Sequence, residues 1–90
     1  MSELLFDFMK KANNDVRIRT AHISVYAALI YLRHERRNVE PLSIFSYEVM
    51  PVCKISGPAC YHRTIRQLAE YGYIRYVPSY NHLLGSLVYL

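Results

Sequence analysis

The sequence predicts a single α+β domain that is mainly helical and ends in a β-hairpin. Its first three quarters hold four segments whose apolar residues recur every three or four positions, the spacing of a helix with one buried face. After Gly72 the spacing changes to alternation, in two short runs on either side of a turn-rich stretch that begins at Pro78. A length of 90 residues suits one hydrophobic core, so we expect one domain over 1–90.

The expected elements follow one another with short connections. They are helices at about 3–13, 21–37, 47–54 and 57–71, a short strand at about 42–45, and hairpin strands at about 73–78 and 86–90. The residues expected to cap the helix starts are Ser2, Thr20, Ser46 and Ser56. Gly72 follows the last helix at the position where a left-handed residue commonly ends one.

The second helix is the expected centre of the core. Two neighbouring apolar stripes cover most of it, at Ile23, Tyr26, Ala27 and Ile30 and at Val25, Leu29 and Leu32. A helix that is apolar on most sides is buried on most sides. The first helix has one narrower stripe, made of Leu5, Phe8, Met9 and Ala12. Lys10 and Lys11 should point away from that stripe. Leu4 and Phe6 lie off it, where they would contact another helix or a second subunit.

Positive charge is concentrated in the C-terminal part of the chain, although the net charge is only +4. Residues 1–53 carry seven Lys and Arg against six Asp and Glu, a net of +1. Residues 54–90 carry four against one, a net of +3. Such a segment is the natural partner of a polyanion. The alternative is that the extra charges only keep a tyrosine-rich surface soluble.

Secreted and membrane proteins are not expected. Acidic Glu3 and Asp7 interrupt the first apolar residues, so these do not resemble a secretory signal. The apolar run from Ile23 to Leu32 is too short to span a bilayer. Two cysteines do not make a secreted disulfide framework. We therefore expect a soluble, cytoplasmic protein with reduced thiols.

Catalytic and metal-binding classes are not expected either. The residues Cys53, Cys60 and His62 have the spacing C-x6-C-x-H, which matches no usual zinc site. A glycine-rich phosphate loop and a nucleophile elbow are both absent from the sequence. We expect no enzyme activity, no metal, no cofactor and no small-molecule ligand, and Cys53 should be a small buried hydrophobe.

A short helix joined by a tight turn to a longer basic helix predicts a helix-turn-helix, whose second helix can enter the major groove of DNA. In segment 57–71 the expected inward residues are Tyr61, Ile65 and Leu68. The expected outward residues are Ala59, His62, Arg63, Arg66 and Gln67. Arginine can pair with guanine and glutamine with adenine, and a small residue permits close approach. The alternative is that these residues form the solvated face of an ordinary amphipathic helix.

The segment Ile55–Ile74, with the sequence ISGPACYHRTIRQLAEYGYI, resembles the pattern of winged helix-turn-helix DNA-binding domains. The matching features are a start with Ser and basic residues, an I-x-x-L core pair, and G-x-I before the hairpin, or wing. From Ile23 onward the chain is similar to helix-turn-helix domains of replication initiators and to small regulatory proteins of bacterial conjugative transposons. Two features depart from the pattern. Cys60 stands where it has Thr, and residues 82–89 lack Lys and Arg, so the wing should hold phosphate weakly.

The resemblance and the charge pattern together predict a sequence-specific protein that binds double-stranded DNA, with segment 57–71 in the major groove. The resemblance implies a transcriptional regulator associated with a mobile element. A homodimer is expected, with residues 1–14 as a possible contact, because single modules bury little surface on DNA. The expected DNA-binding residues are Ser56, Ala59, His62, Arg63, Arg66, Gln67 and Arg75.

The alternative function is a winged-helix module that binds a protein of a replication or conjugation complex through its apolar wing. The charge and polarity of the exposed surface should distinguish DNA binding from protein binding. A continuous positive face over His62, Arg63 and Arg66 would favour DNA. An exposed apolar patch at Leu84, Leu87 and Tyr89 would favour a protein partner.

Overall fold

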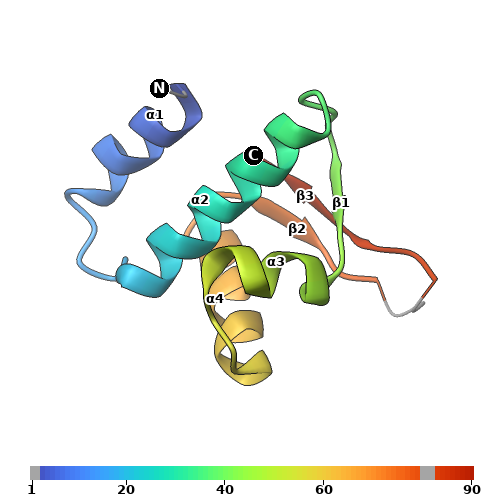
Figure 1. Cartoon of the computed structure of the whole chain (residues 1–90). Coiled ribbons are helices and arrows are strands. Elements are labelled where there is room, and N and C mark those ends of the chain that lie inside the picture. The colour runs from blue at the N-terminus through green and yellow to red at the C-terminus, as the bar shows by residue number, and fades with distance from the viewer. Residues whose placement is uncertain (1–2, 80–82) are drawn as a thin grey trace.

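The computed structural model describes residues 3–79 and 83–90 (Figure 1). The elements of this part are α1 (Glu3–Ala12), α2 (Thr20–Glu35), β1 (Leu42–Ile44), α3 (Ser46–Cys53), α4 (Pro58–Glu70), β2 (Arg75–Val77) and β3 (Ser86–Tyr89). Their order and types confirm a mainly helical α+β fold, and the layout is compatible with a winged helix. Every one of these elements begins and ends within two residues of its predicted position.

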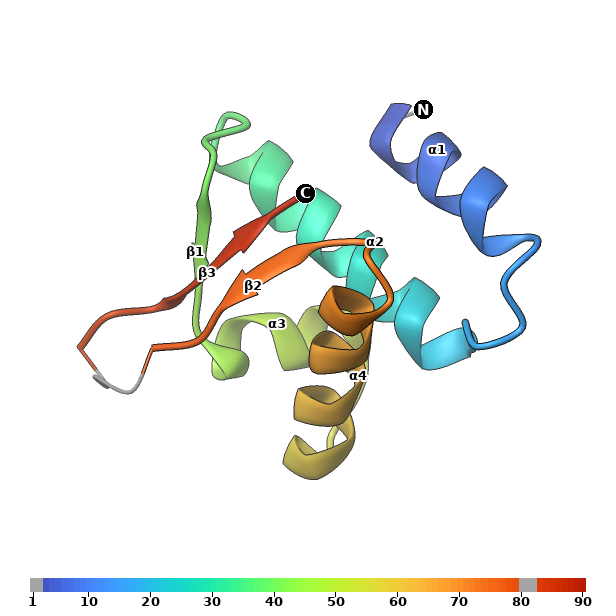
Figure 2. The ribbon, with the colours of Figure 1, turned by 180° about the vertical axis from the view of Figure 1, so that it is seen from behind.

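The strands form one antiparallel sheet in which β3 lies between β1 and β2 (Figure 2). Val88 of β3 pairs with Leu42 on one side and with Tyr76 on the other. Leu42, Ile44 and Val88 are buried, so this face of the sheet closes the core against the helices. Alternate positions of a strand point to opposite faces. Ser43 accordingly lies on the outer face and is exposed.

The centre of the hydrophobic core is α2, as predicted. Val25 and Leu29 have no exposed surface. Phe8 of α1 stacks on Tyr26 of α2, with ring centroids 4.0 Å apart. The predicted stripe of α1 is wrong at Met9, which is 42% exposed, because Phe8 is the buried residue of that helix.

A Schellman motif closes the C-terminus of α4. Gly72 has a φ of 86°, which confirms the predicted glycine. The Tyr73 N–H donates to the Leu68 carbonyl at 2.9 Å, and the Gly72 N–H donates to the Ala69 carbonyl at 3.1 Å. Lys11 does not point away from the fold as predicted. Its Nζ donates to the Gly72 carbonyl at 3.2 Å and lies 4.5 Å from the centroid of the Tyr73 ring, which ties α1 to the end of α4.

Three predicted helix caps are wrong, namely Thr20, Ser46 and Ser56. The N-cap residues are Arg19, Phe45 and Gly57. In the first two cases a side chain three residues inside the helix binds the cap backbone. His22 Nδ1 accepts the Arg19 N–H at 2.9 Å, and Glu48 Oε1 accepts the Phe45 N–H at 2.9 Å. The predicted cap at Ser2 lies outside the described residues.

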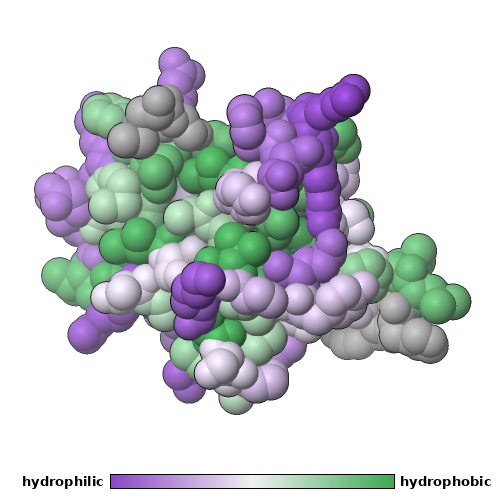
Figure 3. Space-filling view, viewed as in Figure 1, coloured by the Kyte–Doolittle hydropathy of each residue, from purple (hydrophilic) through white to green (hydrophobic). Residues whose placement is uncertain are grey.

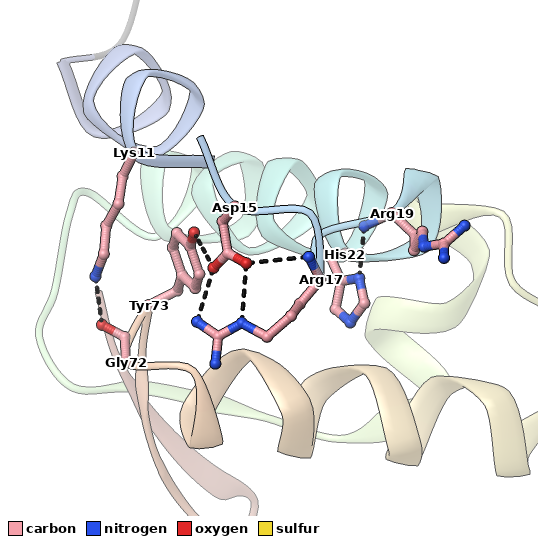
Figure 4. A network of polar contacts seen from close by, with 7 residues as sticks. All are labelled: Lys11, Asp15, Arg17, Arg19, His22, Gly72 and Tyr73. Carbon is pink, nitrogen blue, oxygen red and sulfur yellow. Dashed lines mark hydrogen bonds and ion pairs between the residues drawn. The ribbon is translucent and has the colours of Figure 1, made fainter. Parts of the chain in front are cut away.

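A polar network joins the α1–α2 connection to the end of α4 (Figure 4). The Asp15 carboxylate accepts hydrogen bonds from Arg17 Nε and Nη2, each at 2.9 Å, and from the Tyr73 hydroxyl at 2.8 Å. The Arg17 guanidinium also lies 4.2 Å from the centroid of the Tyr71 ring. The hydrogen bonds from Arg17 hold the pKa of Asp15 well below its ordinary value of 3.8. Burial and the Asp15 carboxylate raise the pKa of Tyr73 to about 12.

The free energy of unfolding is expected to fall in acid because of Asp15. Its native pKa lies below the value in the unfolded chain, so its contribution is complete above the ordinary value of 3.8. Below that pH the unfolded chain takes up a proton that the native state does not, and the contribution is lost. Asp15→Asn should therefore show a smaller drop in urea midpoint than the unmodified protein between about pH 5 and pH 2.

The matched control for this measurement is Asp7→Asn, which removes an exposed carboxylate on α1. This variant should keep the full loss of stability in acid. If Asp15→Asn follows the unmodified protein across the same pH range, the network does not contribute to acid sensitivity.

Candidate nucleic-acid interface

The helix α4 has one buried and one exposed face. Its buried residues are Tyr61, Thr64, Ile65 and Leu68. Thr64 was not expected among them, and its Oγ1 donates to the Cys60 carbonyl at 2.8 Å, which satisfies the hydroxyl inside the core. The opposite face exposes Ala59, His62, Arg63 and Arg66. We refer to His62, Arg63 and Arg66 as the basic face of α4.

The two arginines of the basic face differ from most arginines of the N-terminal half. Arg17, Arg33 and Arg36 are each paired with a carboxylate, those of Asp15, Glu40 and Glu48. Arg63 and Arg66 form neither an ion pair nor a hydrogen bond with any of the described residues. Their guanidinium groups keep all of their donors for an external acceptor. Glu70, exposed in the last turn, gives that end of the helix the opposite charge.

Gln67 is not simply part of the outward face, as had been expected from its position. Its side chain is half-buried, and its Oε1 lies 2.8 Å from Nε2 of His22 in the first turn of α2. Periodicity within α4 could not have revealed this contact, because the two residues are 45 positions apart. The one available signal was a histidine in an apolar helix, since a buried polar side chain needs a partner.

A groove of about 460 Å³ runs between α4 and the β2–β3 hairpin. It is lined by His62, Arg66, Ala69, Tyr76, Pro78, Ser79 and Ser86. An adjoining hollow of about 160 Å³ shares His62, Tyr76, Ser79 and Ser86 and extends toward the start of α3. The sequence pattern did not indicate Tyr76, Ser79 or Ser86, because their proximity to α4 depends on how the hairpin folds back. The basic face therefore borders a concave surface with both polar and apolar walls.

The remaining predicted site residues lie apart from the basic face. Arg75 is on the outer face of the sheet, at the end of β2 farthest from the hairpin tip. Its guanidinium lies 4.9 Å from the centroid of the Tyr89 ring. Ser56 is exposed in the turn before α4 and borders an apolar hollow on α3 that also includes Tyr47 and Met50.

The described residues on the β3 side of the hairpin tip are apolar. Leu83 is 75% exposed and Leu84 is 63% exposed. Figure 3 shows hydrophobic atoms at this tip, beside residues drawn in grey. An exposed patch at Leu84, Leu87 and Tyr89 would favour a protein partner, but Leu87 and Tyr89 are half-buried. Within its described residues, the exposed apolar surface of the hairpin therefore consists of Leu83 and Leu84 together with Val77 of β2, which is 39% exposed.

The two cysteines occupy different environments. Cys53 is buried, as predicted, and burial raises the pKa of its thiol. Cys60 is half-buried on α4. In residues 3–79 and 83–90 we find no group of three or more His, Cys, Asp or Glu side chains that could hold a metal ion. Among these residues there is also no helix with the length and apolar composition needed to cross a membrane.

Comparisons with known protein families, with curated proteins and with solved structures find no match to this chain.

Proposed function

We propose that the protein is a winged-helix domain that binds double-stranded DNA sequence-specifically, with α4 as the recognition helix. The observation that carries this proposal is the pair of exposed guanidinium groups of Arg63 and Arg66, which lie one turn apart on α4 and have no partner among residues 3–79 and 83–90. The element order and the β1-β3-β2 sheet support it, because they place a short helix and a turn directly before α4 and a hairpin directly after it. The protein is a binding protein and not an enzyme.

The proposed complex has the basic face of α4 in the major groove. That groove is about 12 Å wide and admits one helix. Arg63 and Arg66 reach base edges, and the groove between α4 and the hairpin accommodates the adjoining sugar–phosphate backbone. By its resemblance to small regulators of conjugative transposons, the protein acts as a transcriptional regulator of a mobile element.

Binding to duplex DNA is expected to depend strongly on salt. Three or four cationic contacts from one domain predict a log–log slope of affinity against salt near −3, and two domains predict about twice that. The measurement is fluorescence anisotropy of a labelled duplex between about 50 and 200 mM salt. Failure to bind at the lowest salt, or an affinity that does not change with salt, would contradict the proposal.

The exposed hairpin tip favours a second candidate function. Leu83 and Leu84 form an apolar surface of the kind that protein partners cover. In this alternative the domain docks a protein of a replication or conjugation complex. The hairpin would then be the functional surface and the basic face of α4 would be solvated. The two functions predict opposite results for substitutions in α4 and at Leu84.

We also propose that a second copy of the chain binds the outer face of α1. Phe6 is 61% exposed there, next to Met9, and Figure 3 shows hydrophobic atoms over α1 and the adjoining part of α2. Glu3 and Lys10 flank Phe6 on the same face at opposite ends of the helix. Two antiparallel copies of α1 would therefore bring Glu3 of each copy toward Lys10 of the other. This charge pattern complements itself in a twofold dimer.

Phe6→Glu is expected to dissociate this dimer, because the twofold axis places both new carboxylates in one apolar contact. The dimer Kd measured by sedimentation equilibrium should rise by at least about 30-fold. Val39→Glu is the control, because Val39 is equally exposed but lies in the α2–β1 connection. A protein that is monomeric at every concentration tested, or a Phe6→Glu variant as dimeric as the control, would contradict the proposed dimer.

A further inference from the structure

His22 is buried between two helices of the domain. It lies in the first turn of α2 and is 5% exposed. Its ring centroid is 5.9 Å from that of Tyr71, at the C-terminal end of α4. Its two ring nitrogens face different partners, Arg19 of its own helix start and Gln67 of α4. The imidazole therefore bridges the backbone at the start of α2 and the half-buried side chain of Gln67 on α4.

The backbone partner determines which ring nitrogen carries the proton. Nδ1 of His22 lies 2.9 Å from the backbone nitrogen of Arg19, which can only donate (Figure 4). Nδ1 must therefore accept, and a neutral imidazole then carries its proton on Nε2. Nε2–H donates to the Gln67 side chain at 2.8 Å, where only the amide oxygen can accept. The backbone of Arg19 thus fixes the orientation of the Gln67 amide through His22.

The fixed amide limits what Gln67 can recognise. Glutamine pairs with adenine by accepting from N6–H with its oxygen while donating to N7 with its nitrogen. In this protein the oxygen lies 2.8 Å from Nε2 of the buried His22, between α2 and α4, and one of its two lone pairs is used there. The NH₂ group has no hydrogen-bond partner among the described residues, so both of its donors are left for an external partner. The two free donors outnumber the one remaining lone pair, which favours an edge made of acceptors, and guanine presents two major-groove acceptors, N7 and O6.

We propose that His22 is a positioning residue that holds the Gln67 amide with its NH₂ group outward, so that this position of α4 selects guanine over adenine. The inference rests on the proposed function, because it assumes that α4 lies in the major groove. His22 itself does not touch DNA.

The first test is selection of bound sequences from a randomised duplex pool with the full chain. The unmodified protein should enrich guanine at one position, and Gln67→Leu should lose the preference at that position only. His22→Phe frees the amide oxygen and should shift the same position toward adenine by about tenfold, with the other positions unchanged. Gln67→Glu keeps an acceptor toward His22 but presents an acceptor outward, and should shift the position toward cytosine.

Two results would overturn the inference without affecting the proposed function. One is a His22→Phe variant that folds and selects the same sequences as the unmodified protein, while Gln67→Leu does not. The other is a Gln67→Glu variant that keeps the preference for guanine. The second variant leaves His22 in place, so it can overturn the inference even if His22→Phe does not fold.

The hydrogen-bond arrangement can also be tested without DNA. Nitrogen NMR of the His22 ring in the free protein should show Nδ1 without a proton and Nε2 with one. A proton on Nδ1 would overturn the inference whatever the protein binds. Failure of the unmodified protein to bind any duplex would overturn the proposed function, and the guanine preference with it, while the ring nitrogens could still show the expected protonation.

Discussion

Replacing Arg63 or Arg66 with alanine is expected to weaken binding to a preferred duplex by about 1–3 kcal/mol for each substitution. Both side chains are exposed on one face of α4 and form no ion pair within the described part of the chain, so their donors are free for base edges or phosphates. Base contacts specify a sequence and phosphate contacts position the protein. The substitution that removes a base contact should therefore relax selectivity at one position as well as reduce affinity.

Two other arginine substitutions serve as comparisons in this experiment. Arg37→Asn removes an exposed cation from the turn that follows α2, at a backbone φ of 60° that asparagine tolerates, and should have little effect. Arg75→Ala should weaken all sequences alike and reduce the salt slope by about one if Arg75 meets phosphate. Its place on the outer face of the sheet, beside Tyr89, makes that the weaker of the arginine effects.

The hairpin substitutions decide between the two candidate functions. Leu84→Ser and Leu87→Ser should leave DNA binding nearly unchanged if α4 is the functional surface. Silent substitutions at Arg63 and Arg66, together with loss of binding in Leu84→Ser while the fold is intact, would make the hairpin the functional surface instead.

Gly85→Ala is expected to reduce the free energy of unfolding by about 1–3 kcal/mol. A Cβ atom at this position would lie 2.6 Å from Ser43 Oγ, 2.8 Å from the Ile44 carbonyl oxygen and 3.1 Å from the Ile44 nitrogen. The serine side chain can rotate, but the two backbone atoms belong to β1 and cannot move without separating β1 from β3. Thermal unfolding should show a lower Tm, by roughly 4–8 °C for each kcal/mol in a domain of this size.

The double variant Ser43→Ala/Gly85→Ala separates the two sources of crowding. It removes Ser43 Oγ but leaves the Ile44 backbone in place, so most of the destabilisation should remain. Full recovery of the Tm in the double variant would show that only the serine side chain was in the way. An unchanged Tm in Gly85→Ala itself would contradict the close approach of the two strands.

The helices and the hairpin were predictable because their signals are local. The apolar residues of a buried helix face recur every three or four positions, and Gly72 stands where the helix C-terminus needs a positive φ. The helix caps were not predictable in the same way. Thr20 and Ser46 are good cap residues by type, but His22 and Glu48 bind the preceding backbone instead, and either arrangement satisfies the free N–H groups.

The candidate site was predictable only in part. The outward positions of Arg63 and Arg66 follow from the spacing of the buried residues of α4. The engagement of Gln67 with His22 does not, because it depends on how α2 and α4 cross. The contact of Lys11 with the Gly72 carbonyl escaped prediction for the same reason, since lysine on a short amphipathic helix normally faces water.

The central position of β3 also determines when the sheet can form. β1 and β2 do not pair with each other, and each hydrogen-bonds to β3 alone. During synthesis on a ribosome, about half of the chain is made after β1 before its partner strand β3 exists. The helices α1 and α3 can pack against α2 during that time, because they are its neighbours in sequence. Closing the long loop between β1 and β3 is then the non-local step, and topologies with such steps fold more slowly than helical ones of equal stability. Until that step occurs, Leu42 and Ile44 have no strand to pair with, and this short apolar segment is the one most exposed to misassociation in the growing chain.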